Sequence, residues 1–176
     1  FVNELDAFLA KDNDSLDTAE RIAAKLNVAL PEIEVSDFRE AGYVPEAITN
    51  FLGLLGWNPG MKLPDGKDLE KFDRPFLAQH FSLERIGTTN AKFDRQKLLS
   101  FNGDYLGAMT NQQFADRWEH WLHHEQPESL RGQPAPIAAA LRDPTRRLWL
   151  AAAVKPRAKI FRDALTAAAF LLRTDD

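Results

Sequence analysis

Two histidines are the residues in this sequence best spaced for chemistry. His120 and His124 lie four positions apart, so on a helix they share one face, where two imidazoles can hold a metal ion. A third ligand is indicated only by Glu125 or by a carboxylate far away in the sequence. A polar helix face accounts for the same spacing, and we expect that face and no metal site.

Other catalytic arrangements are missing from the sequence. It contains no glycine-rich phosphate loop that follows a strand, and no serine nucleophile elbow. It also contains no cysteine, which excludes disulfides, thiolate metal sites and cysteine nucleophiles and favours a cytoplasmic setting. Glu32 and Glu34 form a carboxylate pair, but they lie in a solvated acidic segment. We therefore expect neither a catalytic residue nor a cofactor in this chain.

Charge is distributed unevenly along the chain, whose net charge is −4. Residues 1–48 carry four basic and eleven acidic side chains, whereas residues 130–162 carry eight basic and one acidic. Such a basic zone suits a face that binds a polyanion. A solvated helical face whose charges meet acidic neighbours in the fold would give the same pattern.

The spacing of apolar residues predicts helices along nearly the whole chain, and therefore an all-α fold with little or no sheet. Residues 28–38 and 61–73 are expected as extended or loop segments, because Pro31 and a Pro-Gly turn interrupt the helical pattern. The expected helical stretches are 1–11, 16–27, 45–55, 74–86 with a break, 95–106, 111–125, 135–154 with a break near Pro144, and 155–176.

Several residues are suited to the helix ends. Pro45 fits a first turn, and Asp94 and either Thr110 or Asn111 fit N-caps. Gly56 is expected to end its helix in the left-handed conformation.

The four tryptophans are expected to pack. Trp118, Trp121 and Trp149 are predicted to lie in the core, and Trp57 to fold back on its helix end, although it could stack on a nucleotide.

Length and hydropathy restrict the class of protein further. A chain of 176 residues suffices for one large or two small domains. The longest apolar run, 164–172, is bounded by Asp163 and Arg173 and predicts a buried helix, not a membrane span. Because the chain begins with Phe1, we expect a piece of a longer protein.

Two stretches resemble the region that follows the catalytic domain of glutamyl-tRNA synthetases, which are class I enzymes. They are DFREAGYVPEAITNFLGLLGWNPG (37–60) and FSLERIGTTNAKFDRQKLLSFNGDYL (81–106), and the segment 154–172 is similar to the helix bundle of that family. The matching residues are Gly42, Tyr43, Pro45, Glu46, Ala47, Asn50, Phe51, Leu52, Leu54, Leu55, Gly56, Trp57, Leu83, Glu84, Arg85, Phe93, Asp94, Lys97, Leu98, Asn102, Gly103 and Tyr105.

This resemblance implies a domain organisation and a function. Residues 1–35 would be a helical insertion or linker, 36–106 a stem-contact-like region and 107–176 a helical bundle like an anticodon-binding subdomain. The H-I-G-H-type and K-M-S-K-S-type motifs of the family are missing from this chain, so the chain alone is not expected to be active. The parent enzyme would use ATP and Mg²⁺ to attach glutamate to tRNA. The implied partners are tRNA(Glu) and the upstream catalytic domain.

The residues expected to contact tRNA fall into two sets. The first set surrounds a helix start, where backbone N–H groups favour phosphate: Asn90, Lys92, Arg95 and Lys97. The second set belongs to the basic zone: Arg146, Arg147, Lys155, Arg157, Lys159 and Arg162. Alternatively, both sets are solvated helix surface, and the chain is a helical module that kept the synthetase fold but binds a protein.

Overall fold

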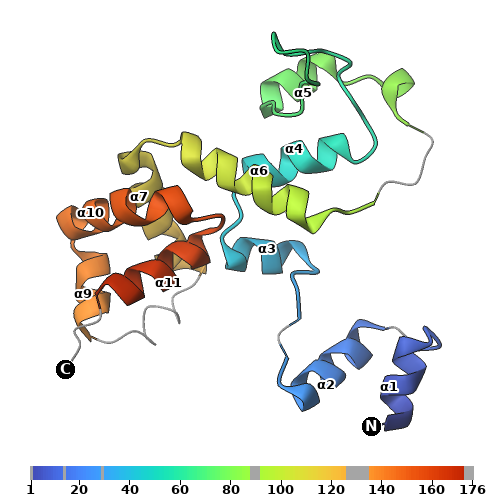
Figure 1. The fold of residues 1–176 in the computed structure, drawn as a ribbon, viewed down its shortest axis with the longest axis horizontal. Helices are drawn as coiled ribbons and strands as arrows, with labels where there is room; N and C mark the ends of the chain where they lie inside the picture. Colours follow the sequence, from blue (N-terminus) through green and yellow to red (C-terminus); the bar gives the residue numbers. More distant parts are fainter. Residues whose placement is uncertain (1, 14, 29, 88–91, 126–134, 173–176) are drawn as a thin grey trace. The chain divides into compact units, whose positions relative to one another are not determined.

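Helices make up the protein, which the computed structural model describes over residues 2–13, 15–28, 30–87, 92–125 and 135–172. The described residues form two isolated β-bridges and no strand, which confirms the predicted all-α fold (Figure 1). The helical elements are α1 (Val2–Leu9), α2 (Leu16–Leu26), α3 (Val35–Ala41), α4 (Pro45–Leu54), α5 (Arg74–His80), η1 (Leu83–Arg85), α6 (Arg95–Ala108), α7 (Asn111–His120), η2 (Trp121–Glu125), α9 (Ala135–Arg142), α10 (Pro144–Val154), η3 (Lys155–Arg157) and α11 (Phe161–Leu171).

The chain divides into two compact units, residues 1–38 and 39–176, with the boundary inside α3. The first unit contains α1 and α2, which pack against each other. These two helices bury little: α1 has no buried residue, and α2 buries Thr18, Ile22 and Ala23. The large core of the protein therefore belongs to the second unit.

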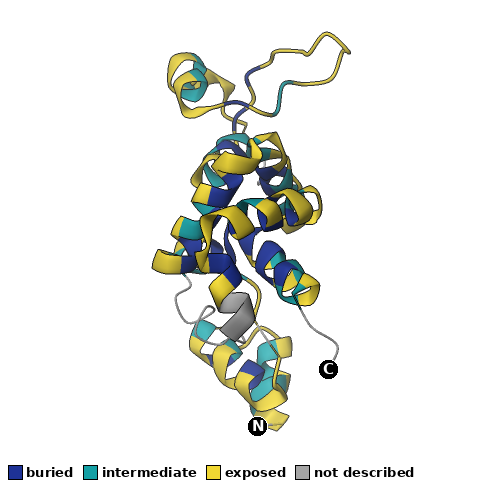
Figure 2. Ribbon diagram, turned by 90° about the vertical axis from the view of Figure 1, so that its left-hand side faces the viewer, coloured by how far each residue is buried: buried dark blue, intermediate teal, exposed yellow. Residues whose placement is uncertain are grey.

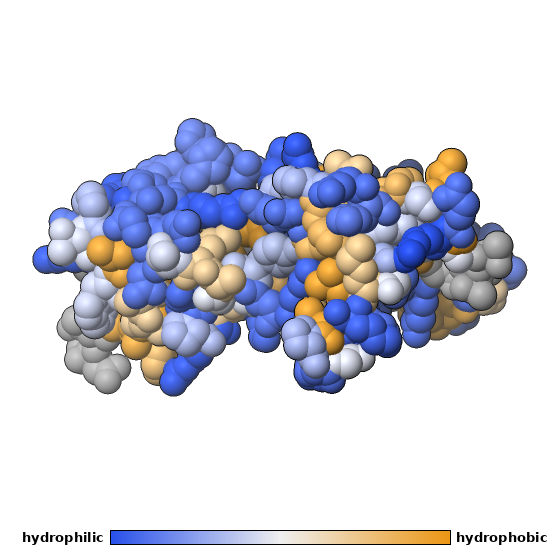
Figure 3. Space-filling model, turned by 90° about the horizontal axis from the view of Figure 1, so that it is seen from above, coloured by the Kyte–Doolittle hydropathy of each residue, from blue (hydrophilic) through white to orange (hydrophobic). Residues whose placement is uncertain are grey.

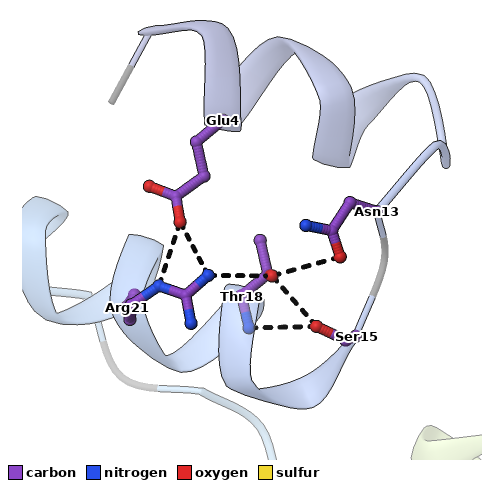
Figure 4. Close-up of polar contacts among 5 residues, drawn as sticks. All are labelled: Glu4, Asn13, Ser15, Thr18 and Arg21. Carbon is purple, nitrogen blue, oxygen red and sulfur yellow. Dashed lines mark hydrogen bonds and ion pairs between the residues drawn. The ribbon is translucent and has the colours of Figure 1, made fainter.

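Polar contacts around Thr18 join the two helices of the first unit (Figure 4). Arg21 of α2 approaches the carboxylate of Glu4 in α1 to 2.8 Å and also donates to the Thr18 hydroxyl. Ser15 caps α2 by accepting the N–H of Thr18. Because Thr18 is almost completely buried, this hydroxyl needs the partners that surround it.

The core of the second unit lies between α7, α9, α10 and α11. Phe114 and Trp118 of α7 are completely buried, and the Phe114 ring lies 5.3 Å from that of Phe161 in α11. Leu150 and Val154 bring the inner face of α10 into the same cluster. Figure 2 shows buried residues on the inward faces of helices and exposed residues on their outward faces.

A second packing region joins α4 to α6 and to the polar loop before α5. Asn50 of α4 is almost completely buried, accepts the N–H of Phe72 at 3.1 Å and donates to the carbonyl of Glu70 at 2.8 Å. The Tyr105 hydroxyl of α6 lies 2.9 Å from the same Asn50 oxygen. One asparagine thus fixes the end of the loop to two helices.

Two predicted element boundaries are wrong. The segment 28–38 was expected to be extended or loop-like, but its last four residues belong to α3, which begins at Val35. Asp37 stabilises this helix start by accepting the N–H groups of Ile33 and Glu34. The expected helix over 155–176 is interrupted after η3. Asp163 accepts the N–H groups of Lys159 and Ile160 and so starts a new helix, α11.

The expected left-handed cap at Gly56 is also wrong. Among the described residues, the glycines with positive φ are Gly42, Gly60 and Gly66. Helix α4 ends at Leu54, and its C-cap, Leu55, has right-handed geometry. The Gly56 carbonyl instead accepts the N–H of Gly87 at 2.7 Å, beside the bridge that Trp57 forms. The chain therefore leaves α4 by pairing with the segment after η1.

Polar side chains cover most of the face shown in Figure 3, with apolar side chains between them. Large apolar residues are nevertheless exposed at scattered positions, among them Leu9, Leu83, Trp149 and Phe170. None of the described helices has the length and apolar character needed to cross a bilayer.

Candidate nucleic-acid interface

A buried asparagine joins the elements that carry the predicted basic residues. Asn102 of α6 is fully buried, and its Oδ1 accepts the N–H of Val44, at the start of α4, at 2.8 Å. Its Nδ2 donates to the carbonyl of Lys159, between η3 and α11, at 2.5 Å. The first bond is buried and the second partly buried, and together they fix the position of the Lys159 segment relative to α4 and α6.

A glycine makes the second connection at this junction. Gly42 has a φ of 93°, and its carbonyl accepts the N–H of Phe161 at 3.2 Å. A Cβ at Gly42 would lie 2.6 Å from the Cβ of Phe161 and 2.7 Å from its backbone nitrogen. Both the positive φ and the close approach of two backbones require glycine here.

The first predicted set lies where α6 begins, except for Asn90, which falls outside the described residues. Asp94 caps the helix by accepting the N–H of Lys97 at 3.0 Å, as the sequence predicted. Lys92 is exposed, and the Arg95 guanidinium lies 5.7 Å from the centroid of the Phe93 ring. Lys92 and Arg95 therefore stand on the surface at the positive end of the helix.

Lys97 is engaged within the protein. Its ammonium lies 2.7 Å from a carboxylate oxygen of Glu70 and 5.5 Å from the centroid of the Phe101 ring. It lines a shallow cavity of about 270 Å³ together with Trp57 and Arg85, whose guanidinium is bound to the carbonyl of Pro59. The ion pair is partly exposed and adds at most about 1 kcal/mol of stability.

The second predicted set is divided between different environments. Arg157 and Lys159 are exposed, and the structure shows no ion pair of theirs within its described part. Arg162 is exposed in the first turn of α11. Lys155 is half-buried and donates to the carbonyl of Met109 at the end of α6, at 2.6 Å.

Arg147 belongs to the core and does not face solvent. It is 5 % exposed, contacts the carboxylate of Glu119 at 2.5 Å and donates to the carbonyl of Leu141 at 3.0 Å. Its neighbour Arg146 is exposed, but it lies nine residues before Lys155, roughly 13 Å along α10. The structure therefore separates both arginines from the group at η3 and α11.

Helix α6 connects the first predicted set with Lys159 of the second. A Cβ at Gly103 would lie 2.6 Å from the Cδ of Lys159, so the aliphatic stem of that lysine lies directly on the glycine. Gly103 is eight residues after Arg95, which is roughly 12 Å along the helix. The basic groups at the start of α6 and the side chain of Lys159 are thus placed along one rigid element.

The histidine pair lies on the protein surface. The rings of His120 and His124 lie side by side with centroids 4.4 Å apart, and both residues are exposed. Glu125, the nearest candidate for a third ligand, is paired with Arg39 at 2.8 Å. Among the described residues, no group of three metal-binding side chains lies together.

Three of the four tryptophans lie in the core, which confirms the prediction for Trp118 and Trp121. Trp57, Trp118 and Trp121 are 3 %, 0 % and 4 % exposed, and Trp57 packs against Phe72 with ring centroids 5.7 Å apart. Burial of Trp57 leaves no ring face for a nucleotide. The prediction for Trp149 is wrong, because this residue is 62 % exposed.

Three features of this region were not predicted from the sequence. Asn102 and Gly42 had no predicted role, because their partners are 57 or more residues away in the chain and leave no local signal. Trp149 was expected to be buried, although the spacing of Leu150 and Val154 places the buried face of α10 at other positions.

The sequence is similar to curated glutamate–tRNA ligases over part of their length. It is 36 % identical over 101 residues to the enzyme of Thermobifida fusca, a match that covers 57 % of this chain and 20 % of that protein. It is 47 % identical over 81 residues to the enzyme of Amoebophilus asiaticus, covering 46 % of this chain and 15 % of that protein. No model of a known protein family matches the chain.

Solved structures show the same likeness at the level of the fold. A glutamate tRNA ligase from Elizabethkingia meningosepticum, in complex with its amino acid, gives a TM-score of 0.59 at 24 % identity, covering 79 % of this chain and 24 % of that one. The glutamate-tRNA synthetase of Elizabethkingia anophelis gives 0.56 at 25 % identity, with the same coverage. The resemblance drawn from the sequence motifs is therefore confirmed.

Proposed function

We propose that this chain, which matches one part of the glutamate–tRNA ligases, holds tRNA(Glu) for a catalytic domain elsewhere in the same protein. ATP and Mg²⁺ would act in that catalytic domain, and this chain would supply none of the reacting groups. The intact protein would then be a glutamate–tRNA ligase of the cytoplasm. The chain spans a fifth or less of the length of the two curated relatives quoted above, so the activity is proposed for the intact protein.

One observation supports the proposal most strongly. Arg157 and Lys159 are exposed and lack an ion pair within the described part of the chain, yet Asn102 holds the backbone carbonyl of Lys159, two residues after Arg157. Cations that are already paired, such as Lys97, must give up a carboxylate before they can bind phosphate. Arg157 and Lys159 have no such cost, and a fixed backbone lets them position an RNA backbone.

The test is binding of tRNA(Glu) over a series of salt concentrations. For the unmodified chain, the logarithm of the association constant should fall linearly with the logarithm of the salt concentration. The double variant Arg157→Glu/Lys159→Glu should bind at least about tenfold more weakly at low salt. Its salt slope should be shallower by about 0.7–0.9 for each phosphate that the variant no longer neutralises.

The matched control is the double variant Lys62→Glu/Lys67→Glu. These two exposed lysines are paired with Asp68 and Asp65, and the double variant changes the net charge by the same amount. It should bind tRNA(Glu) nearly as well as the unmodified chain. Equal weakening by both double variants, or binding that salt does not affect, would contradict the proposal and favour a protein-interaction module.

A further inference from the structure

Trp149 is the exception among the tryptophans. It is 62 % exposed, whereas the other three are at most 4 % exposed. A single exposed apolar residue is common on protein surfaces and by itself indicates nothing. Evidence that this indole binds a ligand must therefore come from the residues around it on α10.

The two faces of α10 are sharply different. Arg147, Leu150 and Val154 are buried, and α10 packs on α7, α9 and α11. The opposite stripe carries Arg146 and Trp149, three positions apart, and both are exposed. In α10, all of which the structure describes, Trp149 is the only large apolar residue that is exposed.

Charge on this stripe is positive only. Helix α10 contains no acidic residue, and the carboxylate of its N-cap, Asp143, accepts the backbone N–H of Arg146 at 2.7 Å. The side chain of Arg146 has no ion pair within the described part of the chain, and the same holds for Arg157, which follows Trp149 by eight residues. Ala152 and Ala153 are exposed between Trp149 and η3 and leave room for a backbone to approach.

We propose that Trp149 is a stacking platform for an unpaired nucleotide of the bound RNA, with Arg146 and Arg157 contacting the phosphates on either side. This inference rests on the proposed RNA-binding function. An aromatic ring between cations is the arrangement with which proteins bind single-stranded nucleic acid, because every base has a face that can stack. A base in a duplex is already stacked on its neighbours, so the ligand is a loop or a single-stranded end.

A protein partner fits this stripe less well. The cores of protein interfaces are depleted of charge and bury several apolar residues together. On α10 a single indole stands between arginines and alanines. The observations therefore favour RNA, and a protein partner becomes one outcome of the test.

The experiment combines intrinsic fluorescence with affinity. The 176-residue chain is titrated with tRNA(Glu) and with a short single-stranded RNA, and the red-edge emission of exposed tryptophan is followed. Because three tryptophans are buried, that emission reports mainly Trp149, and stacking should quench it. Trp149→Ala should weaken binding of both RNAs by about 5- to 150-fold, the usual cost of losing one stacked base.

Two further variants separate stacking from other effects. Trp149→Phe keeps an aromatic face and should recover most of the affinity that Trp149→Ala loses. Thr145→Ala is an exposed substitution beside the proposed platform on α10 and should leave affinity unchanged. The thermal unfolding midpoint of each variant should match that of the unmodified chain, because Trp149 is outside the core.

The results distinguish this inference from the proposed function. If Trp149→Ala binds both RNAs normally while Arg157→Glu/Lys159→Glu does not, the stacking role is overturned and RNA binding stands. If no variant changes the affinity and RNA leaves the emission unaltered, both proposals fail together.

Discussion

At the scale of single residues, Asn102 is the side chain on which the junction depends most. Asn102→Ala would leave the N–H of Val44 and the carbonyl of Lys159 without their buried partner. We expect the free energy of unfolding to fall by about 2–4 kcal/mol, because each unsatisfied buried group costs about 1–3 kcal/mol. Urea denaturation followed by circular dichroism measures the change.

The matched control for Asn102 is Gln96→Ala on the exposed face of the same helix. It should change the free energy of unfolding by no more than about 0.5 kcal/mol. A decrease of similar size in both variants would show that the asparagine is not special and that α6 as a whole is sensitive to substitution.

Because of Tyr105, the free energy of unfolding should depend on pH in the alkaline range. Burial, followed by the negative charges of Asp73 and Glu46, raises the pKa of its hydroxyl above the ordinary value. The folded state thus holds this proton more tightly than the unfolded chain, so stability is intact below about pH 10 and falls as the pH rises through the folded pKa.

Tyr105→Phe tests this pH dependence. The variant loses the hydroxyl that lies 2.9 Å from both Asn50 Oδ1 and the carbonyl of Phe72, so it should be less stable at neutral pH. Its free energy of unfolding should then decline less steeply above about pH 10 than that of the unmodified protein. Parallel declines in the two proteins would contradict the assignment.

The sequence predicted only in part which basic residues are exposed and unpaired, and so available to bind RNA. Arg146 and Arg147 are adjacent and alike in sequence, yet one is exposed and the other buried. The spacing of Arg147, Leu150 and Val154 contained that information. The partner of Lys97 could not be foreseen, because Glu70 lies 27 residues away and only the tertiary fold brings the two together.

At the scale of elements, the entry into α4 depends on Gly42. Gly42→Ala should lower the free energy of unfolding by about 2–4 kcal/mol, the combined cost of a positive φ and of overlap with Phe161. Gly66→Ala is the matched variant, since Gly66 has a φ of 85° and nothing within 4 Å of the added methyl group.

The Gly66 variant isolates the cost of the backbone conformation. It should be less stable by about 1–2 kcal/mol, which is the penalty for a left-handed alanine alone. Chemical denaturation of both variants gives the comparison. Equal destabilisation at the two glycines would show that the close approach of Phe161 to Gly42 contributes nothing.

Helix starts were predictable because their signals are local. Asp94 and Thr110 cap α6 and α7 as expected, and the break near Pro144 coincides with the Asp143 cap of α10. The break after η3 was missed, although Asp163 provides its own local signal through the N–H groups of Lys159 and Ile160. Because this break was not predicted, the irregular segment that carries the exposed Arg157 and Lys159 was not predicted either.

At the scale of the whole molecule, the all-α class followed from helical spacing throughout the chain, since no stretch alternates long enough for a sheet. The joining of α4, α6 and α11 did not follow, because it depends on bonds between residues far apart in sequence. The division of the chain at 106/107 stays a prediction. The RNA interface that includes Lys92, Arg95 and Lys159, which lie along α6, also stays a prediction.

The most direct test of the central claim is hydrogen–deuterium exchange on the chain with and without tRNA(Glu). The claim is that α6, η3 and the start of α11 present one RNA-binding surface. We expect slower exchange on RNA binding in peptides covering residues 92–98 and 155–163 together, with little change in residues 61–71. Unchanged exchange in both segments, under conditions where tRNA is bound, would contradict the claim.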